Sequence, residues 1–492
     1  MLEDRLYPLV RLYQELPGPV ATAVGAGYRR VPERLKFGAQ YLTTRSVLED
    51  TEQWDPAALA DFQWAATLRT LRYAARKVPW YGRTWAEHGV RVAQLTAPED
   101  LALLPTVSKQ DVRDHWHDFI SVDARPRDAL MMTTSGSTGE PLRLLWLRGV
   151  TRPRERAYIE HLWRRAGYRD GERLAMLRAL LVHGRAEGQL WRRDAARNRW
   201  IFSTFDMTSE NCRAIVEELR RVQPVYLHVY ASALSTLCSY MIRAGVAGCI
   251  PSVRAVFAGS ENFFPWQRDL LAQAFGEHVQ VVRWYGMGEH VSLAGSCECS
   301  QAYHVFSQYS FTELLRDDGT PARLPGEVGE IVGTAFDNWV MPFIRYRTAD
   351  RARLGPERCA CGRPYTLWDE TLGRSTTWVV TAGGDRLQFA PALFASYGRA
   401  LSVVRRFQFE QREPGVLDLW LVPWPEASLA DVGAVVRLFE ARLVPTFELR
   451  PHVVQSLEQL PGGKHEYLVQ RLAGVAPAEA AGAPAAPDPA PG

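Results

Sequence analysis

The chain has 492 residues, which exceeds the usual reach of one hydrophobic core, so two or more domains are expected. Hydrophobic residues make up 47% and charged residues 23%, as in a soluble globular protein, and a net charge of +3 argues against a nucleic-acid groove. Apolar runs stay below the ~18 residues that a membrane helix needs, and the N-terminus does not resemble a leader. We therefore expect a cytoplasmic protein with no membrane span and no nucleic-acid partner.

The first part of the chain is expected to be helical. Residues 1–60 carry aromatic and aliphatic residues at helical spacing and predict N-terminal helical elements. Residues 62–90 predict a longer helix that ends at Pro79, because proline ends or kinks a helix. Ser108 is placed to cap the start of another helix.

A run of Thr, Ser and Gly follows at residues 131–144, MMTTSGSTGEPLRL. Gly136 and Gly139 let the backbone turn where a side chain would clash, and the hydroxyl groups and backbone N–H groups suit phosphate oxygens. It is not a Walker A loop, because no Lys follows Gly139. The alternative is a Ser/Thr-rich surface turn.

Strands and helices then alternate. We expect strands at residues 142–147, 173–177, 225–230, 253–258 and 279–285, and helices at 151–167, 206–222, 232–245 and 267–275. This alternation predicts α/β architecture with largely parallel sheets. Ligands collect at the carboxyl ends of such strands, where three loops emerge at 133–139, 259–264 and 286–290.

The C-terminal part changes character. From about Gly326 the sequence reads as short β-like runs, and residues 400–460 alternate strands with a helix at Leu429–Leu443, which suits a small α+β domain. Residues 476–492 are almost wholly Ala, Pro and Gly and are expected to be disordered.

Rare residue types mark further candidate sites. The basic residues are nearly all Arg, and the only lysines are Lys36, Lys77, Lys109 and Lys464. A lysine in such a chain is a candidate for a role that needs a compact ammonium group, although three or all four could be surface residues. Of the seven cysteines, four form two close pairs in GSCECS and ERCACGR, a spacing that favours metal over disulfides in a cytosolic chain.

Five motifs occur in one order: SGSTGEP, WYGMGEH, RYRTADR, LGR and LPGGK. Together they resemble the adenylate-forming superfamily of acyl-CoA synthetases, luciferases and adenylation domains. KVPWYGR, LPTVSKQDVR, YAS and CxCGR are similar to phenylacetate–CoA ligases and their relatives encoded with capsular polysaccharide genes. The resemblance covers roughly residues 60–470, and the ordered set is specific although no single motif is.

The resemblance implies a site for ATP. Nucleotide contacts are expected from Thr134, Ser135, Gly136, Ser137, Thr138, Gly139, Ser260, Glu261, Tyr285, Gly286, Met287, Asp350 and Arg374. Tyr285 would flank adenine, and the Asp350 carboxylate would accept both ribose hydroxyls. The catalytic residues would be Lys464, Glu289 and Arg374. Glu289 would ligate Mg²⁺, Arg374 would reach the ribose or phosphate, and Lys464 would contact the reacting carboxylate and the α-phosphate.

Taken singly, each of these residues could have a structural role and no function in a nucleotide site. YGMGE could be a strand-to-turn segment, Asp350 could form a salt-bridged turn with Arg347 or Arg351, and Lys464 could be an exposed loop lysine. Three positions also depart from the family pattern: Gly288 replaces Thr or Ser, Ala349 replaces Gly, and Thr376 replaces the hinge Asp. The change at Thr376 leaves adenylation possible and puts the CoA half-reaction in doubt.

A metal site and a substrate pocket are also expected. The zinc ligands would be Cys299, His304, Cys359 and Cys361, a closed Cys₃His set and a structural role, with Cys297 as a substitute for Cys299. The alternative is scattered free thiols. The acid pocket would include Tyr230, Ala231, Phe263, Phe264 and Gly286, with Trp266 nearby. These side chains predict an aromatic or otherwise apolar acid.

The fold expected is a large N-terminal α/β domain with packed sheets and a small, mobile C-terminal α+β domain. The boundaries are 1–60 for helical elements, 61–373 for the core, with a zinc-bearing β region at about 290–372, 374–475 for the lid and 476–492 for the tail. The expected function is activation of an acid to its acyl adenylate, then transfer to CoA. Alternatives are another acceptor (an amine, a carrier protein or an inorganic nucleophile) and a nucleotide-binding module without turnover, which Lys464 disfavours. A homodimer stays possible.

Overall fold

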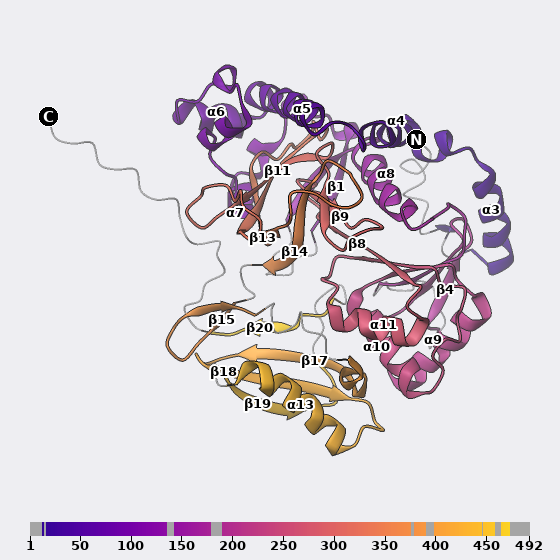
Figure 1. Cartoon of the computed structure of the whole chain (residues 1–492). Coiled ribbons are helices and arrows are strands. Elements are labelled where there is room, and N and C mark those ends of the chain that lie inside the picture. Colours follow the sequence, from indigo (N-terminus) through magenta and orange to yellow (C-terminus); the bar gives the residue numbers. More distant parts are fainter. Residues whose placement is uncertain are drawn as a thin grey trace.

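The structure is a computed structural model that describes residues 12–13, 16–134, 142–178, 189–374, 378–389, 398–444, 446–457 and 464–472. Figure 1 shows a large part, which holds the N-terminal helices and a long sheet, and a smaller C-terminal part with its own sheet and helix. Across these ranges, none of the helices has the length and apolar character needed to cross a membrane.

One 12-stranded sheet runs through the large part in the order β11-β12-β13-β14-β10-β9-β8-β7-β6-β3-β5-β4. The strands are β3 (Leu174–Leu177), β4 (Trp191–Asp194), β5 (Arg199–Phe202), β6 (Tyr226–Val229), β7 (Ala255–Gly259), β8 (Gln280–Gly286), β9 (Leu293–Gly295), β10 (Tyr303–Val305), β11 (Ser310–Leu315), β12 (Val328–Ala335), β13 (Tyr346–Leu354) and β14 (Thr366–Arg374). Strands β5, β3, β6, β7 and β8 are parallel, and those from β8 through β9 to β11 are antiparallel. The sheet therefore changes direction at β8.

Helices cover both faces of the parallel half, as expected for short, almost wholly apolar strands. They are α8 (Thr151–Arg164), α9 (Ser209–Val222), α10 (Ala231–Arg243) and α11 (Pro265–Phe275). Side chains alternate between the faces: Tyr226 and Phe257 pack with residues of α8, whereas Leu227 and Val256 pack with residues of α9, α10 and α11. The predicted α/β architecture is confirmed.

Helices and a hairpin precede this sheet. The elements are α3 (Gly18–Arg30), α4 (Glu33–Thr51), α5 (Pro56–Lys77), α6 (Pro79–Glu87), η2 (Val92–Gln94), η3 (Pro98–Leu103), α7 (Lys109–Asp114), η4 (Trp116–Phe119), η5 (Pro126–Asp128), β1 (Ala129–Thr133) and β2 (Arg143–Leu147). Proline divides the predicted long helix into α5 and α6 at Pro79. Ser108 caps α7 and forms a capping box with Asp111, as expected. Strand β1 was not expected.

The smaller part forms an α+β unit. Its elements are β15 (Trp378–Val380), β16 (Arg386–Gln388), η6 (Gly398–Val403), β17 (Val404–Gln411), β18 (Val416–Pro423), α13 (Leu429–Leu443), β19 (Glu448–Val453) and β20 (Leu468–Gln470). Four strands form a sheet in the order β19-β18-β17-β20. Helix α13 has the predicted bounds, because Ser428 and Asp431 form a capping box at its start. The domain boundaries themselves stay predictions.

A charged network ties α4 to α8 and to the turn before β14. The Glu52 carboxylate contacts His161 at 2.7 Å, Arg165 at 3.3 Å and Arg363 at 3.0 Å. Burial alone would raise the pKa of Glu52, but the hydrogen bond and charge of His161, with the two arginines, lower it to about 2. The carboxylate therefore stays ionised at neutral pH and links three distant segments of the chain.

Candidate active site at the carboxyl ends of the parallel strands

The predicted site residues gather where β6, β7 and β8 end. Tyr285 lies at the end of β8, and Asp350 lies on β13 of the antiparallel half. The Tyr285 hydroxyl donates a hydrogen bond of 3.0 Å to Asp350 Oδ2. Burial and the charge of Asp350 raise the pKa of Tyr285 well above its usual 10, so the hydroxyl keeps its proton and acts as the donor. This bond brings together two residues expected to hold adenine and ribose.

Asp350 follows a backbone turn of unusual conformation. Ala349 has φ +61°, in the left-handed region that a glycine adopts without strain. Its N–H donates to Glu330 Oε1 at 3.0 Å, and the N–H of Asp350 donates to Thr348 Oγ1 at 3.1 Å. These bonds hold the turn although the family's glycine is absent, and the strain of ~1 kcal/mol is of the size usual for a left-handed non-glycine residue.

The segment Gly286–Glu289 lies against the β1–β2 hairpin. The Trp146 indole N–H of β2 donates to the Gly288 carbonyl at 2.8 Å, and a Cβ on Gly288 would be 3.7 Å from the Thr134 methyl group. Met287 packs, partly buried, in the same hydrophobic cluster as Leu144. Thr134, at the start of the proposed phosphate loop, is therefore adjacent to this turn.

The pKa of the Glu289 carboxyl group is set by its burial and by three neighbouring side chains. Tyr346 donates to its carboxylate at 3.2 Å. Burial raises the pKa of Glu289 and the charge of Asp350 raises it further, while Tyr346 and the Lys109 ammonium act in the opposite direction. A buried carboxyl group beside another carboxylate favours a cation between or beside them. Lys109 and Tyr346 were not predicted, although the rarity of lysine had marked Lys109.

Glu261 connects the large part to the segment that carries Lys464. Its carboxylate accepts hydrogen bonds from the N–H of His465 at 3.0 Å and from the N–H and hydroxyl of Ser232 at 2.9 and 3.0 Å. Burial raises the pKa of Glu261, and these hydrogen bonds and the charge of Lys464 oppose that rise. Lys464 thus lies beside the ends of β6 and β7, next to the expected nucleotide residue Ser260.

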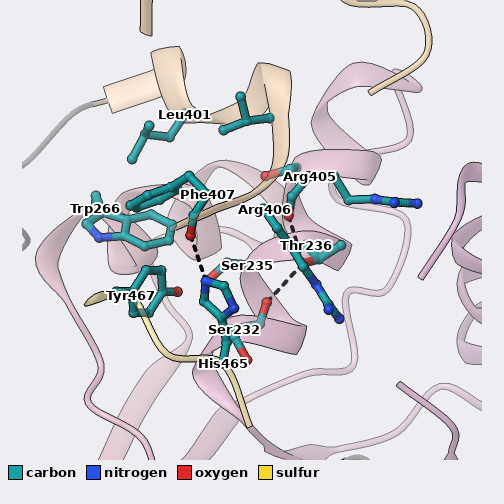
Figure 2. A pocket seen from close by; sticks show the side chains of 12 residues that line it. Ser232, Ser235, Thr236, Trp266, Leu401, Arg405, Arg406, Phe407, His465 and Tyr467 are labelled. Atoms are coloured by element: carbon teal, nitrogen blue, oxygen red, sulfur yellow. Dashed lines mark hydrogen bonds between the residues drawn. The ribbon is translucent and has the colours of Figure 1, made fainter. Parts of the chain in front are cut away.

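The two parts meet on a mainly apolar surface. Figure 2 shows His465 between Phe407 of β17 and Ser232 of α10, with Trp266 and Tyr467 beside them. The His465 ring donates to the Phe407 carbonyl at 2.7 Å. Burial and the charge of Arg406 lower the pKa of His465 to about 4, so the ring is neutral at this junction.

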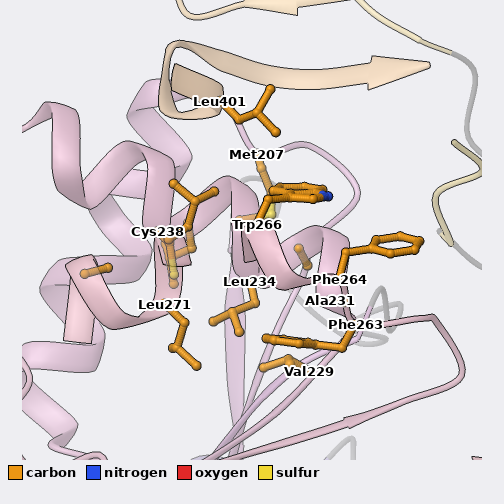
Figure 3. Packing of buried hydrophobic residues seen from close by; sticks show 14 of the residues in the cluster. Met207, Val229, Ala231, Leu234, Cys238, Phe263, Phe264, Trp266, Leu271 and Leu401 are labelled. Atoms are coloured by element: carbon orange, nitrogen blue, oxygen red, sulfur yellow. The ribbon is translucent and has the colours of Figure 1, made fainter. Parts of the chain in front are cut away.

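Two aromatic residues expected in the acid pocket are buried in this structure. Phe263 and Phe264 are each 5% exposed and belong to the core formed by α10, α11 and the small part. Phe264 packs edge-on against Tyr467, and Figure 3 shows Phe263 beside Val229. Tyr467 of the small part covers Phe264, and the role of both rings in the acid pocket stays a prediction.

Other members of the expected acid pocket do lie at the strand ends. Tyr230 follows β6 and precedes α10, which begins at the buried Ala231. A Cβ on Gly286 would be 3.8 Å from Glu155 Oε1, and that carboxylate accepts a hydrogen bond from Tyr309 and pairs with His290. Polar groups as well as rings therefore border this space.

Several expected residues cannot be placed at the level of side chains. Ser135, Gly136, Ser137, Thr138, Gly139 and Thr376 fall outside the ranges that the structure describes. Arg374 ends β14, where its backbone pairs with Asp350. Their assigned roles stay predictions.

The cysteine cluster differs from the expected set by one residue. Ligand atoms of Cys297, His304, Cys359 and Cys361 all lie within 4.8 Å of one another. Cys299 is exposed, and its N–H donates to Cys297 Sγ at 3.3 Å. The turn that makes this bond directs Cys297, and not Cys299, to the other three side chains.

No protein-family model matches the chain. It is 27% identical over 366 residues to a phenylacetate–coenzyme A ligase of Thermus thermophilus, a match that covers 71% of this chain and 77% of the relative. It is also 21% identical over 261 residues to Protein CapK of Staphylococcus aureus, covering 52% of this chain and 54% of that protein. A solved structure of 2-hydroxyisobutyryl-CoA ligase in the postadenylation state has a TM-score of 0.68 at 17% identity and covers 85% of this chain and 91% of that one.

The fold is thus that of the adenylate-forming ligases, as the ordered motifs predicted. In sequence the chain is similar to phenylacetate–coenzyme A ligases over about seven tenths of its length, and the predicted resemblance to that branch is confirmed.

The Glu261 contact can be tested by exchange of backbone amides. Replacing Glu261 by Ala leaves the N–H groups of Ser232 and His465 without this acceptor, which costs about 1–3 kcal/mol in a buried position. Hydrogen exchange measured by mass spectrometry should therefore be roughly tenfold faster or more in peptides covering 464–472. The control is Glu413→Ala, an exposed carboxylate of the small part. Equal exchange in both variants would show that Glu261 does not hold this segment.

Proposed function

We propose that this protein uses ATP to activate a carboxylic acid and then transfers the acyl group to coenzyme A. In the first step a carboxylate oxygen attacks the α-phosphorus and pyrophosphate leaves, which forms the acyl adenylate. In the second step the thiol sulfur attacks the acyl carbon and AMP leaves. The enzyme class agrees with the homologous ligases. A reaction supplied with ATP and coenzyme A suits the cytoplasm.

One observation carries this proposal: Asp350 meets Tyr285 and Glu289, which lie 60 or more residues earlier in one motif. Glu261 holds the Lys464 segment at the same edge. A Tyr ring fixed through its hydroxyl offers a flat surface for adenine. Tyr285 donates to Oδ2 of Asp350, so Oδ1 and a further lone pair on Oδ2 can accept hydrogen bonds from the ribose hydroxyls. An ionised carboxylate accepts several hydrogen bonds at once.

Magnesium fits the Glu289 region. Hard divalent cations prefer carboxylate oxygens, and Glu289 supplies such a ligand. Bound magnesium would neutralise charge on the phosphates of ATP. Glu289 itself would orient that end of the nucleotide, and Lys109 would limit the excess of negative charge.

Lys464 would act on the reacting groups as a mobile ammonium. Three N–H donors on a flexible chain can contact both the attacking carboxylate and an α-phosphate oxygen. Glu261 supports this role, because it holds the neighbouring His465 backbone and its charge attracts the lysine. The proposed effect is electrostatic stabilisation where negative charge develops.

Zinc is the proposed occupant of the cysteine cluster. Three thiolates and one imidazole form a closed tetrahedral set that suits structural zinc. His304 Nδ1 donates to the Ala302 carbonyl at 3.2 Å, so Nε2, which lies 3.2 Å from Cys361 Sγ, keeps the lone pair that would ligate the ion. The ion would join the turn after β9 to the turn between β13 and β14, far in sequence but adjacent in the sheet.

The reaction is tested by following pyrophosphate and AMP release across a panel of acids, with and without coenzyme A. Pyrophosphate release should depend on the acid, and acyl-CoA should form only when coenzyme A is added. Lys464→Ala should lower pyrophosphate formation by ~10²-fold or more while ATP still binds, the size expected for one lost charge-stabilising donor.

The matched control is Lys77→Ala, which removes an exposed ion pair with Asp123 and should leave the rate unchanged. Pyrophosphate release that no acid stimulates would overturn the proposed function. An unchanged rate in Lys464→Ala would remove that residue from the site. Acyl adenylate that never passes to coenzyme A but passes to a carrier protein or an amine would change the acceptor.

The zinc proposal is tested by metal analysis of matched serine variants. Protein purified without added metal should contain about one zinc per chain. Cys297→Ser should lose the metal and unfold at lower temperature, whereas Cys299→Ser should keep it, because Cys299 lies outside the cluster. The absence of zinc from the unmodified protein, or its loss in Cys299→Ser alone, would contradict the assignment.

A further inference from the structure

Arg178 is the first residue after β3, at the same edge as the ends of β6 and β7. We infer that its guanidinium group binds a second anionic oxygen group of the acid substrate, so that the acid activated is a dicarboxylic acid or one with an equivalent negative end. The inference rests on the proposed function and concerns the acid, whose class that function leaves open.

Three side chains hold the guanidinium group in place. One terminal nitrogen donates to His228 Nε2 at 2.8 Å, and the other donates to Ser260 Oγ at 2.8 Å. The guanidinium carbon lies 4.8 Å from the centre of the Tyr230 ring. Each terminal nitrogen has a second hydrogen, so the group keeps donors for a ligand. An arginine oriented in this way is prepared to bind a carboxylate.

None of these partners carries a negative charge. Burial and the neighbouring Arg178 keep the pKa of His228 well below its usual range, and a guanidinium has only donors, so the imidazole is neutral and Nε2 accepts. Ser260 and Tyr230 supply a hydroxyl and a ring face. Among the residues that the structure describes, Arg178 forms no ion pair with a carboxylate, and its side-chain hydrogen-bond partners are His228 and Ser260. Its positive charge can therefore bind an anionic group of a ligand, because ligands bind at this edge of such sheets.

The arginine lies on the face of the sheet that also holds the expected pocket residues. Met176 pairs with His228 in the register of β3 and β6. Side chains two residues apart point to the same face of a sheet, so Arg178 shares the face of Met176, His228 and Tyr230. Gly259 and Trp284 share this face, and a Cβ on Gly259 would collide with the Trp284 ring. His228 is 7% exposed and its Nδ1–H has no hydrogen-bond partner within the described structure. A ligand oxygen or a water could satisfy it.

Arg178 contacts Ser260, an expected nucleotide residue, but it lies far from Thr134 and Gly288, and this distance favours the acid over the phosphates of ATP. Thr134 and Gly288 lie on the far side of β8, next to the β1–β2 hairpin. Arg178 follows β3, which is separated from β8 by β7 and β6, and three strand spacings amount to about 14 Å. The Lys464 segment, held by Glu261 at the end of β7, lies between these two positions. An acid with its reacting carboxylate near Lys464 and its second carboxylate at Arg178 spans this arrangement.

An apolar acid would be selected against. Such an acid would bring a methyl group or an aromatic edge to a guanidinium and would remove water from it without giving a hydrogen-bond acceptor. Sites built around a charged hydrogen-bonding group discriminate strongly against ligands that lack the partner. Phe263 and Phe264, which suggested an apolar acid, are buried in the core and supply no competing surface.

The experiment compares matched acids that differ only at the far end, adipate against hexanoate and terephthalate against benzoate. Acid-dependent pyrophosphate release should show kcat/KM at least ~10-fold higher for the dicarboxylate of the pair that fits the pocket. Arg178→Gln should remove most of that preference by lowering kcat/KM for the dicarboxylate. Arg178→Lys keeps the charge but not the planar fork and should fall between. In both variants the KM for ATP should stay unchanged.

The matched control is Arg173→Gln, an exposed arginine just before the other end of β3 that donates to the Gln223 carbonyl. The inference would be overturned if the unmodified protein had the higher kcat/KM with the monocarboxylate. It would also be overturned if Arg178→Gln lowered kcat/KM by the same factor for both acids. A rise in the KM for ATP that is the same with every acid would assign Arg178 to the nucleotide instead.

A binding measurement separates this inference from the proposed function. Calorimetry with adipate and with hexanoate, in the presence of a non-hydrolysable ATP analogue, needs no turnover. Preference for adipate that is lost in Arg178→Gln, without pyrophosphate release from any acid, would retain the anion site and reject the ligase function. Turnover without any preference for a dicarboxylate would retain the ligase function and reject the anion site.

Discussion

The hydrogen bond from Tyr285 to Asp350 joins the two halves of the sheet, and the site depends on it. Tyr285 ends the last strand of the parallel half, and Asp350 belongs to a strand of the antiparallel half. The sheet is continuous between them through β9, β10 and β14. A single sheet that changes direction at β8 can therefore present a ring and a carboxylate from segments 65 residues apart to one ligand. Misplacing either half by one register step would turn these side chains to the other face.

The small part packs against the large part next to the candidate site. Its aromatic residues continue the core of α10 and α11, and Glu261 makes the polar contact at this junction. Apolar packing supplies most of the attraction and has little directional preference, whereas the Glu261 hydrogen bonds fix the position of one backbone segment. The proposed role of Lys464 depends on this division, because a long flexible side chain can act on the reacting groups only if its backbone is held near them. A unit attached in this way can also move if another contact replaces these.

Local sequence was sufficient for much of the fold and for part of the site. Helix α13 was predicted with its observed bounds, because its Ser428 cap and apolar spacing are both local. The ordered motifs singled out Tyr285, Asp350 and Glu289, which lie close together in the structure, and their roles stay predictions. The sequence could not show whether Cys297 or Cys299 belongs to the cluster. Only one residue separates the two cysteines, and the conformation of the turn decides which thiol faces the other ligands.

Long-range packing decided the remaining cases. Phe263 and Phe264 directly precede a helix and resemble exposed loop residues in the sequence, but Tyr467, about 200 residues later, packs against Phe264. Arg178 gave no signal, because arginine is abundant in this chain and its partners His228, Tyr230 and Ser260 come from two other strand ends. Its role depends on topology, which composition does not reveal.

The most direct measurement of the account is the binding of ATP and of 2′,3′-dideoxy-ATP to the unmodified protein and to Asp350→Asn. If Asp350 holds the ribose, the unmodified protein should bind ATP ~10-fold or more tightly than the dideoxy nucleotide, the size of lost hydrogen bonds to a charged group. Asp350→Asn should bind both nucleotides with nearly the same, weaker affinity. A variant that still discriminates between them as strongly as the unmodified protein would contradict the nucleotide site proposed around Tyr285 and Asp350.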